Sequence, residues 1–108
     1  MNPETIETMI ESGRDSYEAR LAAGQARLKQ GDLEQAIAHF KLAIAFRDDQ
    51  TMAWQDLGKA YRDTGDVAAA REAWARGLEV ASANGDKQAE KVMQVWMKRL
   101  QRSVPGDT

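Results

Sequence analysis

The sequence predicts an all-α fold built from a repeated pair of helices, and three observations lead to this expectation. Proline occurs only near the two ends, at Pro3 and Pro105, and β-branched residues never alternate with polar ones as they would in a half-buried strand. Glycine and short polar residues interrupt a chain that is otherwise rich in helix-favouring residues. A shift of 34 residues lays residues 17–50 on residues 51–84, so the helix pair occurs twice.

Five interruptions separate six expected helices. They fall at residues 11–15, 29–32, 47–50, 63–66 and 83–86. The expected helices run over residues 3–12, 16–30, 33–46, 51–64, 67–82 and 86–102, and residues 103–108 form a tail. Asp32 precedes the third helix and Gln35 follows three residues later, which is the capping-box arrangement that starts a helix.

Composition bounds the function classes. Of the 108 residues, 43% are hydrophobic, and 17 acidic residues nearly balance 15 basic ones, so no overall charge attracts the chain to nucleic acid or to a membrane. No cysteine is present, which excludes disulfides and thiolate sites. No secretion signal or membrane-length apolar run is found. We expect one soluble, cytoplasmic domain over residues 1–108, with no metal, no cofactor and no small-molecule substrate.

The two 34-residue units share a specific pattern. Identical pairs are Ala19/Ala53, Gly24/Gly58, Ala26/Ala60, Gly31/Gly65, Asp32/Asp66 and Ala36/Ala70. The pattern resembles the tetratricopeptide repeat, whose first helix carries Trp, Leu, Gly and Tyr and whose second carries Ala, an aromatic residue and Ala. Residues 51–84 match this pattern through Trp54, Leu57, Gly58, Tyr61, Ala70, Trp74 and Gly77. Residues 17–50 keep Gly24, Ala36, Phe40 and Ala43, but Arg20 and Arg27 stand where the family has large aromatic residues.

The resemblance implies a short right-handed α-solenoid of two repeats, similar to the small stand-alone bacterial proteins of this family. Residues 3–12 then form an N-terminal half-repeat helix, because Ile6 and Ile10 fall on the apolar positions of a second helix. Residues 86–102 form a C-terminal capping helix. Its apolar face carries Ala89, Val92, Met93, Trp96 and Leu100, and its opposite face carries Lys87, Lys91, Lys98 and Arg102.

Gly58 lies inside an expected helix, where glycine costs about 1 kcal/mol relative to alanine. It shares a helical face with Trp54, Leu57 and Tyr61. We therefore expect the missing side chain to let the backbone of the partner helix approach closely, with Ala70 meeting the glycine and Trp74 filling the space alongside.

No catalytic arrangement is indicated by the sequence. His39 lies next to the core residue Phe40, without a nucleophile or carboxylate at a suitable spacing, and we expect it at the surface. The aspartate pairs Asp48/Asp49 and Asp63/Asp66 sit at helix ends, where capping explains them. We expect that the protein is not an enzyme.

The resemblance implies a protein–protein interaction module that binds a peptide or partner segment in the concave groove lined by the first helices. The 34-residue repeat assigns the groove positions of the family to residues of this sequence. They are Leu21, Gln25, Leu28, Met52, Gln55, Asp56, Lys59, Arg62 and Met93, together with Glu18, Lys29, Asp63, Asp86, Glu90 and Met97. The carboxylate clamp of the best-known subgroup is absent, because its positions carry Leu21, Gln25, Asp56, Asp86 and Glu90. We expect a neutral or basic partner with apolar anchors.

A second hypothesis is self-association. Two repeats bury a small core, and such an array can be completed by a second copy. Val95 and Met97 flank the apolar stripe of the last helix, so the alternative is a structural domain that forms a homodimer through this terminal helix.

Overall fold

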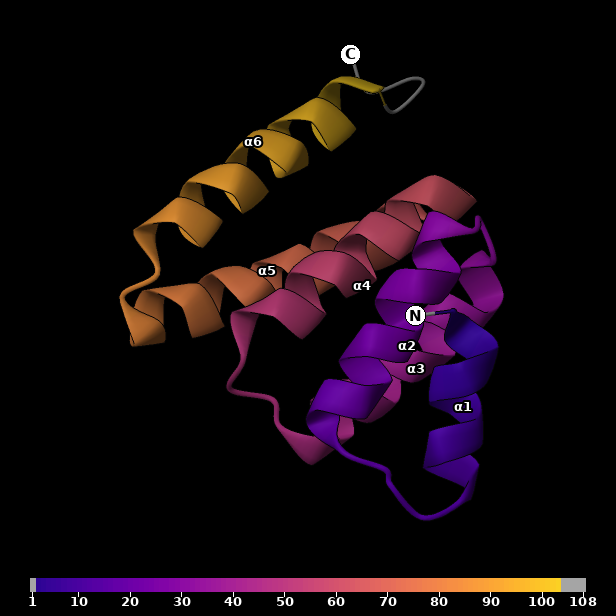
Figure 1. The fold of residues 1–108 in the computed structure, drawn as a ribbon. Helices are drawn as coiled ribbons and strands as arrows, with labels where there is room; N and C mark the ends of the chain where they lie inside the picture. Colours follow the sequence, from indigo (N-terminus) through magenta and orange to yellow (C-terminus); the bar gives the residue numbers. More distant parts are fainter. Residues whose placement is uncertain (1, 104–108) are drawn as a thin grey trace.

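The computed structural model describes the backbone of residues 2–103 and the side chains of residues 2–100. This part of the chain forms six α-helices and no strand (Figure 1). They are α1 (Pro3–Glu11), α2 (Tyr17–Lys29), α3 (Leu33–Phe46), α4 (Thr51–Thr64), α5 (Val67–Asn84) and α6 (Lys87–Ser103). Every bound lies within two residues of the expected one. The predicted tail begins too early, since Ser103 belongs to α6; residues 104–108 lie outside the described residues.

Short polar residues and glycine set these bounds. The side chains that accept a hydrogen bond from the N–H three residues later, and so start a helix, are those of Asn2, Ser16, Asp32, Asp66 and Asp86. Gly65 and Gly85 have φ angles of 89° and 70° and end α4 and α5 in the left-handed conformation. α5 therefore continues past the predicted residue 82 until Gly85 stops it.

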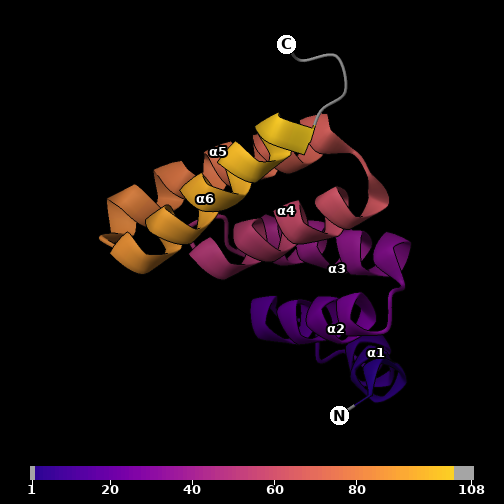
Figure 2. The ribbon, with the colours of Figure 1, turned by 90° about the horizontal axis from the view of Figure 1, so that it is seen from above.

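The helices form a short solenoid. α2 pairs with α3, α4 pairs with α5, and the second pair packs on the first. α6 contacts α5 and α4 in the same way that α4 contacts α3 and α2, and α1 covers α2 at the other end (Figure 2). The fold is thus an all-α solenoid of about two helix-pair repeats with one flanking helix at each end, as the sequence predicts.

A glycine and an aromatic ring meet at the same place in both repeats. A Cβ atom on Gly24 would lie 2.5 Å from the ring of Phe40, and one on Gly58 would lie 2.1 Å from Nε1 of Trp74. Trp74 is fully buried, and its Nε1 donates a hydrogen bond of 3.0 Å to the carbonyl of Gln55. The indole ring itself occupies the space over Gly58, so Trp74, which was expected to fill the space alongside, supplies the nearest atoms.

Candidate protein-binding groove

Two hollows lie on the face formed by the first helices, and together they are called the groove here. The hollow between α2 and α4 has a volume of about 460 Å³ and is lined by Gln25, Leu28, Lys29, Asp56, Lys59 and Asp63. The hollow between α4 and α6 has a volume of about 260 Å³ and is lined by Met52, Gln55, Asp86, Gln88, Ala89 and Val92. α4 contributes residues to both hollows and separates them.

Most residues predicted to line the groove lie at these hollows. Leu21 is an exception because it is half-buried against the apolar clusters around Phe40 and Tyr17. Met93 is a second exception, and its prediction as a groove residue is wrong. Its side chain is fully buried, and its sulfur would lie 2.7 Å from a Cβ atom added at Gly77, so it fills the core between α5 and α6.

Asp56 is a buried bridge between the two repeats. Only 5% of it is exposed, and its Oδ2 accepts a hydrogen bond of 2.9 Å from Nε2 of Gln25. Burial raises the pKa of Asp56, and the bond from Gln25 and the charge of Lys59 partly oppose this shift. Asp56 therefore ties α4 to α2, and its expected use as an accessible charge that selects ligands is corrected.

Two cations of α4 lie on an aromatic surface beside the groove. Nζ of Lys59 and Cζ of Arg62 are each 5.8 Å from the ring centroid of Trp96. The ring of Trp96 in turn packs on Trp74, with 5.2 Å between centroids. Arg62 also pairs with Asp63 at 3.2 Å. These contacts hold both cations near the ring of Trp96. Lys59 also lines the first hollow, but Arg62, which was predicted to line the groove, lines neither hollow and stands beside Lys59 at its edge.

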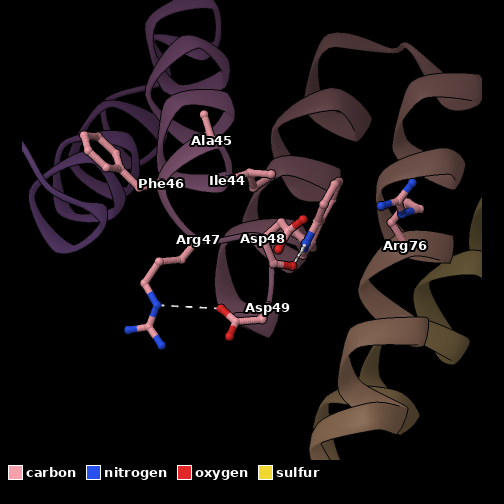
Figure 3. Close-up of a pocket in the computed structure, with 8 residues that line it drawn as sticks. Ile44, Ala45, Phe46, Arg47, Asp48, Asp49 and Arg76 are labelled. Carbon is pink, nitrogen blue, oxygen red and sulfur yellow. Dashed lines mark hydrogen bonds and ion pairs between the residues drawn. The ribbon is translucent and has the colours of Figure 1, made fainter.

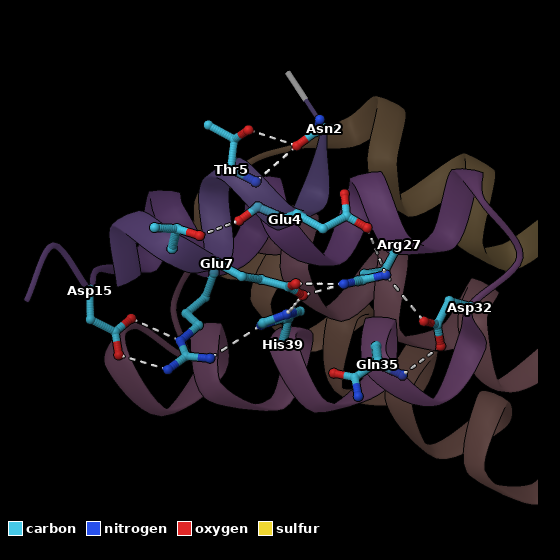
Figure 4. Close-up of polar contacts among 11 residues, drawn as sticks. Asn2, Glu4, Thr5, Glu7, Asp15, Arg27, Asp32, Gln35 and His39 are labelled. Carbon is cyan, nitrogen blue, oxygen red and sulfur yellow. Dashed lines mark hydrogen bonds and ion pairs between the residues drawn. The ribbon is translucent and has the colours of Figure 1, made fainter. Parts of the chain in front are cut away.

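A partly buried polar network lies at the N-terminal end, and the sequence does not predict it. His39 is buried instead of lying at the surface, because α1 covers it (Figure 4). Its Nδ1 lies 3.2 Å from Nη1 of Arg20, and its Nε2 lies 2.7 Å from Oε2 of Glu7. A guanidinium can only donate, so Nδ1 accepts and Nε2 carries the hydrogen that is donated to Glu7.

Arg27 completes this network by holding the carboxylate of Glu7 with two N–H groups, the one from Nε at 3.0 Å. These bonds lower the pKa of Glu7 to about 2, chiefly through Arg27 and against the opposing effect of burial. The signal in the sequence was the replacement of aromatic residues by Arg20 and Arg27. The network joins α1 to α2 and α3, and none of its residues lines either hollow, so we infer a structural role for it.

Replacing Glu7 with glutamine is expected to lower the free energy of unfolding at neutral pH by about 1–3 kcal/mol, because charged hydrogen bonds to Arg27 become neutral ones. Urea denaturation measures the change. Glu4→Gln is the matched control, since Glu4 is exposed and lies 3.7 Å from Arg27, and it should change little. Equal stability of the Glu7 variant and the wild type would contradict the structural role.

The pH dependence of the same variant follows from the shifted pKa. Glu7 titrates at about 2 in the folded state against an ordinary value of 4.5, so the unfolded state binds its proton more tightly. The stability that Glu7 contributes is complete above pH 4.5 and is lost as the pH falls from 4.5 toward 2. We expect the Glu7→Gln variant to lose less stability than the wild type across this window.

The apolar surface of the terminal helix is small. Val95 is 46% exposed, but Met97 is half-buried against the core cluster of α5 and α6. Only Val95 of the two residues is therefore open enough to contact a second copy strongly.

In the described part of the chain, no helix is long and apolar enough to cross a membrane, and no three histidine or acidic side chains are grouped to hold a metal ion.

Comparisons with known proteins agree with this architecture. A family profile described as tetratricopeptide repeat matches residues 4–53 and 21–87.

Two similar proteins extend this match over nearly the whole chain. The TPR repeat-containing protein PA0015 of Pseudomonas aeruginosa is 39% identical over 100 residues, which cover 93% of this chain and 95% of that protein. The solution structure of protein BPP2914 from Bordetella parapertussis has a TM-score of 0.82 and 35% identity, and the match covers 93% of this chain and 87% of that one. The protein described here belongs to the tetratricopeptide repeat family.

Proposed function

We propose that the protein is a non-catalytic interaction module that holds a peptide or a segment of a partner protein in the groove between α2, α4 and α6. The observation that carries this proposal is the presence of two hollows in series on the first-helix face, one on each side of α4. An extended segment that crosses α4 would reach both hollows. Membership in a family of interaction modules that are generally non-catalytic supports the same function.

The lining of the groove favours a neutral or basic segment with apolar anchors. Met52 is 45% exposed beside the second hollow and offers an apolar contact. Asp86 is the one charged residue lining that hollow, among the residues that the structure describes. In the first hollow, Asp56 is buried and Asp63 pairs with Arg62, while Lys29 and Lys59 also line it, so this hollow adds no preference for a basic segment and the preference rests on Asp86. The affinity expected for so small a preformed site is in the micromolar range, about −8 kcal/mol.

The proposal predicts that Met52→Glu reduces partner binding at least about tenfold, a loss of about 1.4 kcal/mol. Affinity capture from a lysate of the native cells, followed by quantitative mass spectrometry, compares the variant with the wild type. Val95→Glu is the matched control, because Val95 is 46% exposed on α6 but does not line either hollow.

The double variant Lys59→Glu/Arg62→Glu tests the edge of the groove in the same capture. Partners that are lost with the groove variants and kept with Val95→Glu would support the proposed site. An identical partner list for the wild type and both groove variants would place binding elsewhere and overturn the proposal.

A further inference from the structure

The outer face of α3 carries an apolar stripe that the packing of the repeat does not explain. Leu42 and Phe46 are 44% and 51% exposed, and Ala38 and Ala45 are exposed beside them. Successive members of this set, from Ala38 to Phe46, are four, three and one residues apart in the sequence, so all four side chains lie on one side of α3. These four residues are called the α3 stripe below.

The second repeat provides an internal comparison for the α3 stripe. A shift of 34 residues places the stripe on Glu72, Arg76, Glu79 and Val80 of α5. Three of these four residues are charged, although α5 has the same place in its repeat as α3. The fold therefore does not require apolar side chains at these positions, and a contiguous exposed apolar surface indicates a contact with another molecule.

An open hollow of about 600 Å³ adjoins the end of the α3 stripe. Its walls include Ile44 and Trp54, and Arg76 of α5 lies with Cζ 5.3 Å from the ring centroid of Trp54. The indole N–H of Trp54 donates a hydrogen bond of 2.9 Å to the carbonyl of Asp48, which fixes the ring and the connection between α3 and α4. The hollow is therefore preformed.

Phe46 is among the residues that line this hollow, and its ring is directed to the other side of the end of α3. Figure 3 shows Phe46 on one side of the end of α3 and Arg76 on the opposite side, across the hollow. One surface therefore carries both a projecting aromatic ring and a cavity large enough to receive one. In an arrangement with two-fold symmetry, each ring of a pair lies over the hollow of the other molecule.

We propose that the α3 stripe and its hollow bind a second copy of this chain in a two-fold dimer. The charges at the rim suit this occupant. Arg47 and Arg76 stand beside Asp48 and Asp49, and Arg47 pairs with Asp49 at 3.6 Å. Because the rim carries both signs in equal number, it does not repel a second copy, and a rotated copy can offer carboxylates to the guanidinium groups. A strongly acidic or strongly basic partner would meet like charges.

The dimer uses the second helices and leaves the first-helix groove open. It thus differs from an association through α6, and it does not depend on the groove binding a peptide. With two grooves in one particle, binding to a partner that carries two segments becomes bivalent and tighter than binding by one groove.

Sedimentation equilibrium of the wild type between about 10 µM and 1 mM tests the dimer, because interfaces smaller than about 1,200 Å² are commonly this weak. We expect the average mass to rise toward twice that of one chain. Leu42→Asp and Phe46→Asp should each weaken the dimer at least about tenfold. Both residues are exposed, so circular dichroism should give the same helix content and thermal midpoint for the variants as for the wild type.

Val95→Asp is the matched control, since it places the same charge at a similarly exposed apolar residue of α6, and it should leave the dimer unchanged. Met52→Glu, which tests the groove, should also leave it unchanged. A wild type that stays monomeric over the whole range overturns the proposal. Dissociation by Val95→Asp but not by Phe46→Asp also overturns it and places the contact on α6.

Discussion

Replacing Trp74 with alanine is expected to lower the free energy of unfolding by about 3–5 kcal/mol. Trp74 is the largest fully buried side chain that the structure describes. It packs against Trp96, fills the space over Gly58 and donates its N–H to the carbonyl of Gln55. Alanine would leave a cavity at the junction of α4, α5 and α6, and a domain of this size has little stability to spare.

Urea denaturation followed by circular dichroism measures this loss without depending on tryptophan fluorescence. Trp74→Phe is the matched control, because it keeps most of the ring over Gly58 but removes the hydrogen bond to Gln55, and an intermediate loss is expected. A loss below about 1 kcal/mol for Trp74→Ala would mean that this ring does not hold the second repeat together.

Gly58→Ala is expected to lower the free energy of unfolding by about 1–3 kcal/mol. In an ordinary helix the same change stabilises by up to about 1 kcal/mol. Here the added Cβ atom would lie 2.1 Å from Nε1 of Trp74, and the rigid, fully buried indole cannot move aside without loss of packing. The sign of the effect is therefore reversed by a single contact.

Gly77→Ala is the matched control for this prediction. The nearest atom to its added Cβ would be the sulfur of Met93 at 2.7 Å, which belongs to a flexible side chain that can shift more easily than an indole. Thermal and urea denaturation should show a smaller loss for Gly77→Ala than for Gly58→Ala. A stabilised Gly58→Ala protein would contradict the packing described for the repeat.

The residues that end helices and those that pack between them made most of the fold predictable. Asp32 and Asp66 start helices by local hydrogen bonds, and Gly65 ends one by a positive φ angle, so their effects depend little on the rest of the chain. The 34-residue shift aligns Gly24 with Gly58, so the sequence itself shows that a glycine recurs inside the first helix of each repeat. Sequence showed that a close contact existed at Gly58, but not that the indole ring of Trp74 made it.

Residues whose burial depends on neighbouring helices were harder to predict. The position of Asp56 in the 34-residue repeat predicts that it lies on the groove face. In the structure, the side-chain amide of Gln25 in α2 donates a hydrogen bond to Asp56, and Asp56 is buried. His39 carried no sign of burial in its own helix, because the covering helix is α1. Met93 was placed on the groove by phase, although its flexible side chain fills the gap beside Gly77. In each case a contact distant in sequence decides the environment.

The sequence alone does not distinguish the α3 stripe from the core. Leu42 and Phe46 fit the apolar pattern of a helix and are easily assigned to the core. Comparison of Leu42 with Arg76 one repeat later, together with the exposure of Leu42 and Phe46, separates surface from core.

Site-specific photocrosslinking in the native cells tests the central claim, that partners bind in the groove, most directly. A photoreactive side chain placed at Gln55, which lines the second hollow, is compared with the same side chain at Glu72 on the exposed surface of α5. The account predicts crosslinks to a partner protein from position 55 and none from position 72. Crosslinks from position 72 without any from position 55 would contradict it.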